Sequence, residues 1–204
     1  MKASFGRVAM ADGSIVLILL GPPGAGKGTQ GARLSASTSI QHVSTGDLFR
    51  TAVQANTPAG LRAESYMRSG HLVPDEVVLH VLEEYLLKTR SQDICFDGFP
   101  RTRRQAERLD ELIEHVGLSL AVVFYISVSD DVALGRLASR GRDDDFIETA
   151  RYRLNLYHSV TEPLIEYYEQ TGVLMKVDGE AEEQVVFDRI EALLAKRDQN
   201  APAN

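Results

Sequence analysis

The chain has 204 residues, enough for one domain with a full hydrophobic core, and its 44% hydrophobic and 25% charged residues are typical of a globular protein. Its net charge of −7 disfavours general attraction to nucleic acid, and its single cysteine, Cys95, excludes a disulfide framework within the chain. The five histidines lack the spacing of metal ligands. Residues 1–14 contain no apolar stretch long enough for a signal peptide and are expected to form a flexible leader, so we expect a cytoplasmic protein.

Strand-like and helix-like patterns alternate along the chain. Runs of aliphatic residues predict buried strands at residues 15–20, 40–43, 93–97, 120–127 and 173–177, all too short to span a bilayer. Helical spacing and capping residues predict helices that open within 44–50 and after 129, and helices at 27–37, 59–68, 74–88, 103–116, 146–170 and 182–196. Pro163 should bend or break the helix at 146–170, and residues 198–204 are expected to be a polar tail. This alternation predicts an α/β fold with a five-stranded parallel sheet flanked by helices.

The stretch GPPGAGKGTQ at residues 21–30 lies between the first predicted strand and the first predicted helix. Glycines allow the positive φ angles that turn successive backbone N–H groups inward, and such a nest at a helix N-terminus binds phosphate. Lys27 adds a positive charge that can reach the β- and γ-phosphates of a nucleotide. Gly28 departs from the usual motif, which has Ser or Thr there. The alternative is a chance turn, but the strand–loop–helix context favours a nucleotide phosphate site.

Arginines at the predicted loops and strand ends are the second chemical signal. Phosphoryl transfer needs positioning and positive charge around oxygens that become more negative, and the guanidinium group suits bidentate contacts to phosphate. Taken singly, each of these arginines is more simply a solvated surface charge. After a phosphate loop, their number favours a phosphoryl-transfer site. They are Arg50, Arg101, Arg140, Arg142 and Arg153.

With these motifs in view, the chain resembles the adenylate kinase family from Ile15 to about Leu194. The motifs that carry the resemblance are GPPGAGKGTQ (21–30), STGDLFR (44–50), DGFPRTRRQ (97–105), RGRDDD (140–145) and TEPLIEYY (161–168). The resemblance implies the P-loop NTPase fold and one domain over residues 15–197, with an AMP-binding lobe at about 44–73 and a short lid at 140–145. It implies reversible transfer of the γ-phosphoryl group of MgATP to AMP, giving two ADP, by a monomeric enzyme that binds neither nucleic acid nor membranes.

The resemblance also implies a role for each matching residue. The catalytic charges would be Lys27, Arg101, Arg140, Arg142 and Arg153. ATP would be held by Gly24, Ala25, Gly26, Lys27, Gly28, Thr29, Arg136 and Arg140, with Arg136 against the adenine. AMP would be held by Thr45, Gly46, Arg50, Val73, Gly98, Arg101, Gln105, Arg142 and Arg153, with Thr45 and Gln105 recognising its adenine. Asp97 would hold waters on Mg²⁺, which would have no direct protein ligand, and Asp144 and Asp145 would orient the lid. The alternatives are that Asp97 caps the next helix, that Gln105 is an exposed helical side chain, and that Asp144 and Asp145 are solvated.

Three other functions compete with this interpretation. A UMP/CMP kinase would share the fold and the arginines, but that relative typically carries Ala and Asn at the positions of Thr45 and Gln105. A P-loop ATPase or switch without a phosphoryl acceptor is the second alternative, and the chain lacks the guanine-reading pattern N-K-x-D. A non-catalytic nucleotide-binding module would not need so many arginines facing phosphate.

Overall fold

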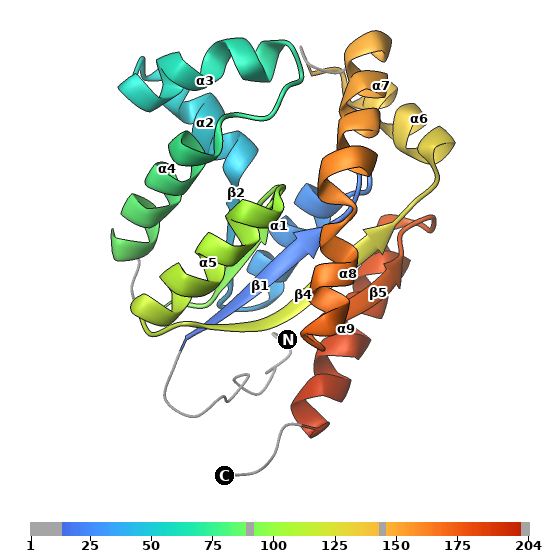
Figure 1. The fold of residues 1–204 in the computed structure, drawn as a ribbon. Coiled ribbons are helices and arrows are strands. Elements are labelled where there is room, and N and C mark those ends of the chain that lie inside the picture. The colour runs from blue at the N-terminus through green and yellow to red at the C-terminus, as the bar shows by residue number, and fades with distance from the viewer. Residues whose placement is uncertain (1–13, 89–91, 143–145, 201–204) are drawn as a thin grey trace.

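A five-stranded parallel sheet forms the centre of the protein (Figure 1). The computed structural model describes residues 14–88, 92–142 and 146–200. The strands are β1 (Ile15–Leu20), β2 (Gln41–Ser44), β3 (Ile94–Asp97), β4 (Ser119–Ser127) and β5 (Leu174–Asp178). They lie in the order β2-β3-β1-β4-β5, and every neighbouring pair is parallel. The predicted α/β class and the five parallel strands are thus confirmed.

Helices connect the strands and cover both faces of the sheet (Figure 1). Their bounds are α1 (Lys27–Ser37), α2 (Thr45–Gln54), α3 (Pro58–Arg68), α4 (Asp75–Lys88), α5 (Arg103–His115), α6 (Asp130–Arg140), α7 (Ile147–Leu156), α8 (Leu164–Gln170) and α9 (Glu183–Asn200). The starts of several follow from capping. The side chains of Ser44, Thr57 and Thr102 each accept a backbone N–H from the first turn of α2, α3 and α5. In the described part of the chain, none of the helices combines the length and apolarity needed to cross a membrane.

Strand β1 takes part in two hydrophobic cores, one on each face of the sheet. Val16, Ile18 and Leu20 pack into the core that includes α4, α5 and α8. Ile15, Leu17 and Leu19 pack into the opposite core, with α1 and α9. Since side chains alternate along a strand, a strand buried on both faces must be apolar at every position. This explains the unbroken aliphatic run from which the strand was predicted. Cys95 is also fully buried, in β3, as expected of a small core side chain.

The predicted break at Pro163 is confirmed, because α8 begins at Leu164, but the helix expected before the proline is wrong in its continuity. The chain forms α7, then a π-helix (Tyr157–Thr161), then α8. Pro163 has no N–H with which to continue the α-helical pattern, and just before it the N–H of Glu162 bonds five residues back to the carbonyl of Tyr157 (2.9 Å). The predicted polar tail is also wrong at its start, because α9 continues through Asp198 to Asn200. The remaining boundaries agree to within about two residues.

The carboxyl ends of all five strands lie at one edge of the sheet, because the strands are parallel. Residues 21–26 follow β1, α2 follows β2, Gly98 follows β3, α6 follows β4 and residues 179–182 follow β5. Ligands of open α/β sheets bind beyond this edge. The predicted phosphate loop and the predicted arginine-bearing segments are therefore brought to the same end of the molecule.

Candidate active site

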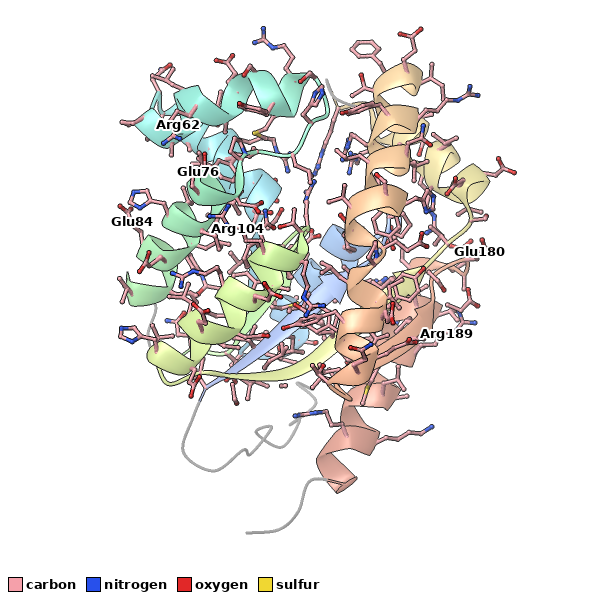
Figure 2. All side chains as sticks on the ribbon, viewed as in Figure 1. Arg62, Glu76, Glu84, Arg104, Glu180 and Arg189 are labelled. Atoms are coloured by element: carbon pink, nitrogen blue, oxygen red, sulfur yellow. The ribbon has the colours of Figure 1, made fainter. Side chains whose placement is uncertain are left out.

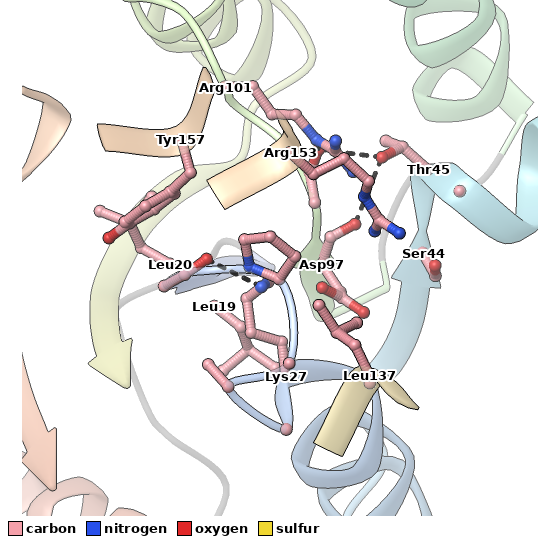
Figure 3. Close-up of a pocket in the computed structure, with 18 of the residues that line it drawn as sticks. Leu19, Leu20, Lys27, Ser44, Thr45, Asp97, Arg101, Leu137, Arg153 and Tyr157 are labelled. Atoms are coloured by element: carbon pink, nitrogen blue, oxygen red, sulfur yellow. Dashed lines mark hydrogen bonds between the residues drawn. The ribbon is translucent and has the colours of Figure 1, made fainter. Parts of the chain in front are cut away.

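A cavity of about 720 Å³ lies at this edge of the sheet (Figure 3). The described residues that line it include every candidate named from the sequence for nucleotide binding, catalysis or the Mg²⁺ water shell. These are Gly24, Ala25, Gly26, Lys27, Gly28, Thr29, Thr45, Gly46, Arg50, Val73, Asp97, Gly98, Arg101, Gln105, Arg136, Arg140, Arg142 and Arg153. Asp144 and Asp145, expected to orient the lid, lie outside the described residues.

The phosphate loop turns on glycines in left-handed conformations. Gly24 has φ +87°, and a Cβ there would lie 2.5 Å from the carbonyl oxygen of Ala133. Gly26, with φ +92°, immediately precedes α1, so the free N–H groups of the first helical turn face the loop. Gly24 therefore permits the close approach of α6, and Gly26 permits the turn into the helix. This is the anion-binding geometry that the motif predicted.

Lys27 is held inside the loop by two backbone carbonyl groups. Its Nζ donates to the carbonyl oxygens of Gly21 and Pro22, each at 2.8 Å. Burial lowers the pKa of Lys27 to about 8; nearby Asp97 opposes this shift, and the positive charges of Arg101, Arg153 and Arg140 add to it. Burial is the main cause of the lowered pKa, and the contributions of the three arginines show that several cationic side chains converge on the region around Lys27.

Asp97 is the carboxylate at the centre of this positive region. It ends β3, and its Oδ2 lies 3.7 Å from Nε2 of His42. Burial opposes ionisation of Asp97, but the neighbouring His42 and the positive charges of Lys27 and Arg101 outweigh burial and lower its pKa. The helix that follows is capped by Thr102, so the alternative that Asp97 is a helix cap is wrong.

The position of Asp97 also explains the departure from the usual loop motif. A Cβ on Gly28 would lie 3.3 Å from Oδ2 of Asp97. A Ser or Thr at this position would therefore crowd the carboxylate. Among residues 14–88, 92–142 and 146–200, no group of three or more His, Cys, Asp or Glu side chains is arranged to hold a metal ion. One buried, ionised carboxylate beside a phosphate loop fits a Mg²⁺ ion that is bound mainly by phosphates and water.

On the other side of the cavity, Thr45, Gly98, Arg101 and Gln105 form one hydrogen-bonded group. The Thr45 hydroxyl donates to the carbonyl oxygen of Gly98 (3.0 Å), and Arg101 Nε donates to the same oxygen (2.7 Å). Gln105 is only 2% exposed, so the alternative that it is a solvent-facing helical side chain is wrong. Its Oε1 accepts the backbone N–H of Arg101 (2.7 Å). The recognition elements expected for AMP are therefore assembled together.

The remaining arginines come from three different elements. Arg50, on α2, pairs with Asp47 one turn earlier. Arg136, on α6, donates through Nη2 to the carbonyl oxygen of Gly179 (2.9 Å), beyond the end of β5. Arg153, on α7, lines the cavity, and its positive charge acts on Lys27. The structure brings the arginines predicted from separate motifs to one cavity.

The turn that precedes α4 touches the helix that carries Arg153. A Cβ on Gly70 would lie 2.8 Å from Cγ2 of Thr149 and 3.1 Å from Cγ of Arg153. The rings of His71 and Tyr152 are next to each other, with centroids 4.8 Å apart. The α3–α4 turn and α7 therefore meet beside the cavity, which Gly70, His71 and Arg153 line.

Sequence reasoning missed several residues of the cavity. Gly179, Glu180, Ala181 and Glu182 follow β5 and line it beside Arg136. Their place after a predicted parallel strand was a usable signal, because loops after such strands meet at the ligand edge. His42 approaches Asp97 from β2, and no pattern in the sequence marks it.

A phosphate loop after the first strand of a parallel α/β sheet, opening directly into a helix, is the architecture of the P-loop NTPases. The family model for adenylate kinase matches residues 19–173. The chain is 44% identical over 179 residues to an adenylate kinase of Synechococcus sp. (strain CC9311), covering 88% of this chain and 98% of that protein. It is 46% identical over 167 residues to one of Corynebacterium aurimucosum, covering 81% of this chain and 92% of that protein. The chain belongs to the adenylate kinase family, and it is a nucleoside monophosphate kinase.

Proposed function

We propose that the cavity carries out the reversible transfer of the γ-phosphoryl group of ATP to AMP, with Mg²⁺ as cofactor, giving two ADP. The observation that carries this proposal is the convergence of Lys27, Arg101, Arg140 and Arg153, close enough for each arginine to lower the lysine pKa. A transferring phosphoryl group spreads negative charge over its oxygens, and preorganised cations stabilise that charge. Arg142, which lines the same cavity, completes the set.

The two nucleotides occupy opposite sides of this cationic centre. On the donor side, the amides of residues 24–29 and Lys27 hold the β- and γ-phosphates, with Arg140 alongside, and Arg136 lies against the adenine. On the acceptor side, Arg50, Arg101, Arg142 and Arg153 grip the phosphate of AMP, and Gly46, Val73 and Gly98 border the nucleoside. Support comes from the lining of a single cavity by all these residues. Holding both nucleotides in one cavity lowers the barrier to the reaction, because in-line transfer requires the donor and acceptor phosphates to be aligned.

Mg²⁺ supplies charge neutralisation at the β- and γ-phosphate oxygens when it is bound. Asp97 would hold its water shell, and the lowered pKa keeps that carboxylate ionised. The short connection at residues 140–145 serves as the lid, and together with the lobe at about 44–73 it excludes water, which would otherwise accept the phosphoryl group. A monomeric enzyme of the cytoplasm remains our prediction.

The acceptor base distinguishes this proposal from a UMP/CMP kinase. Thr45 and Gln105 are both nearly buried and both line the cavity. A carboxamide offers a donor and an acceptor together, as the Watson–Crick edge of adenine requires. These two side chains support AMP as the acceptor.

The test is the initial rate of ADP formation from MgATP with AMP, UMP, CMP or GMP as acceptor, and with no acceptor as control. We expect strong selectivity for AMP. A preference for UMP or CMP would keep the fold and the phosphoryl chemistry but contradict base recognition by Thr45 and Gln105. Equal ADP release without an acceptor would identify an ATPase instead.

A further inference from the structure

The carboxamide of Gln105 is held at both ends by groups of opposite character. Its Oε1 accepts the backbone N–H of Arg101 (2.7 Å), and its Nε2 donates to Oδ1 of Asp75 (2.7 Å). Asp75 is the first residue of α4, thirty positions away in sequence. Gln105 is among the described residues that line the cavity, and Asp75 is not. Asp75 therefore contacts the lining of the cavity through the side chain of Gln105.

This arrangement fixes which way the carboxamide points. A carboxylate only accepts hydrogen bonds and a backbone N–H only donates, so a 180° flip of the carboxamide would place acceptor against acceptor and donor against donor. Both bonds would be lost at a site that is only 2% exposed, where unpaired polar groups are costly. Asp75 is itself fixed, because its Oδ2 accepts the hydroxyl of Thr102 (3.0 Å).

The orientation matters because the two classes of purine present opposite edges. Adenine offers a donor at its 6-amino group and an acceptor at N1, whereas a 6-oxopurine offers an acceptor at O6 and a donor at N1. Gln105 retains one lone pair on Oε1 and one N–H on Nε2, which suits either edge if the carboxamide is free to flip. A glutamine that flips freely would not discriminate between them.

We propose that Asp75 is a specificity-determining positioning residue, which locks the carboxamide of Gln105 in the orientation that selects 6-aminopurine over 6-oxopurine nucleoside monophosphates. The lock rests on the proposed role of Gln105 in reading the acceptor base. Asp75 sets the orientation from outside the cavity, and Gln105 makes the contact with the base.

The test compares kcat/KM for AMP and for inosine monophosphate in the Asp75→Asn variant. Asparagine keeps the size of Asp75 but presents either an oxygen or an NH₂ group, so of these two restraints only the backbone N–H of Arg101 then still opposes a flip of Gln105. We expect the ratio of the two kcat/KM values to narrow by about tenfold, in the range of one bidentate base contact, while KM for ATP stays unchanged. The ratio does not depend on the fraction of folded enzyme, so partial unfolding of the variant cannot mimic the result.

Glu76→Gln is the matched control. It removes the same charge from the same turn of α4, but Glu76 lies toward Arg62 of α3 (Oε1 to Nη2 3.9 Å), as Figure 2 shows. The control should keep the ratio of the unmodified enzyme. An Asp75→Asn variant with an unchanged ratio would overturn the lock, as would a Glu76→Gln variant that narrows the ratio equally, because charge alone would then explain the effect.

The Gln105→Met variant separates the two parts of the proposal, which are the reading of the acceptor base by Gln105 and the locking of Gln105 by Asp75. A loss of selectivity in Gln105→Met together with a loss in Asp75→Asn supports both the reader and its lock. A loss in Gln105→Met alone overturns the lock and leaves the reader standing. An unchanged ratio in Gln105→Met removes Gln105 as the base reader, and the lock is overturned with it.

Discussion

His42 occupies the space that a side chain on Gly31 would need. A Cβ built on Gly31 would lie 2.3 Å from Cδ2 of His42, while Nε2 of the same ring lies 3.7 Å from Asp97. The absent side chain in α1 therefore lets β2 present its histidine to the carboxylate at the centre of the site. A glycine in a helix interior usually costs stability, and here it has a packing reason.

We expect Gly31→Ala to destabilise the protein by about 1–3 kcal/mol, because the added methyl group overpacks against the partly buried ring of His42. Gly135→Ala in α6 is the control, since nothing lies within 4 Å of a Cβ there. That variant should gain about 0.5–1 kcal/mol from helix propensity. Denaturant unfolding of the two variants measures the change in the free energy of unfolding, which should have opposite signs. Equal stabilisation of both variants would contradict close packing of Gly31 against His42.

Lys27→Met should lower kcat by about a hundredfold or more, because a charge that stabilises the transferring phosphoryl group is removed. The same variant should be more stable than the unmodified protein in the absence of nucleotide, since burial of the charged amine disfavours the folded state. Thermal unfolding and initial rates measured on the same preparation test both parts. A variant with near-normal turnover would remove Lys27 from the mechanism.

The lowered pKa of Lys27 has a definite dependence on pH. Because it is about 8 in the folded protein and 10.5 ordinarily, the unfolded chain binds more protons between these values, and the contribution of this group to stability rises with pH across that window. The phosphates of ATP should raise the pKa again. We therefore expect uptake of up to about half a proton on ATP binding at pH 8, measured by calorimetry in buffers of different ionisation enthalpy. Lys27→Met should show no uptake from this group.

Gly28→Ser should weaken the use of Mg²⁺ while leaving the fold intact. The new Cβ would lie 3.3 Å from Oδ2 of Asp97, so the carboxylate would have to shift by a few tenths of an ångström beside the phosphate loop. We expect the free Mg²⁺ concentration for half-maximal rate to rise about tenfold, as for loss of a group that orients a metal's ligands. A titration of Mg²⁺ at saturating ATP and AMP measures this concentration. An unchanged value would contradict a role of Asp97 in holding Mg²⁺.

His158 predicts a second pH effect, at a distance from the nucleotides. Its Nδ1 lies 2.9 Å from Glu162 and its Nε2 lies 2.9 Å from Asp130, so hydrogen bonds to these carboxylates raise its pKa above the ordinary 6.5. The charged ring then contributes stability that is fully present below pH 6.5 and is lost as the pH rises through the raised value. His158→Gln should therefore lose stability at low pH and match the unmodified protein at about pH 9. If the difference in stability between His158→Gln and the unmodified protein does not change with pH, the ion pairs of His158 contribute nothing to stability.

The parts that sequence reasoning reached were those with a local signal. The glycines of residues 21–28 and the aliphatic run of β1 predicted the loop, its flanking elements and the sheet that holds it. The π-helix before Pro163 was missed because the break was expected at the proline, whereas the hydrogen-bond pattern changes in the turn before it. The fit of Gly31 to His42 and the contact of Gln105 with Asp75 join residues that are not adjacent in sequence, and a single sequence read without an alignment does not reveal such pairs.

Strand β1 divides its six side chains between the two cores, and its backbone runs directly into the phosphate loop. Neither layer of helices can detach while the other persists, because both are anchored to the same six residues. Heating should therefore produce one cooperative transition, in which both layers and the nucleotide site are lost together. The phosphate loop therefore keeps its conformation only while the sheet is folded, because β1 belongs to both cores and leads directly into the loop.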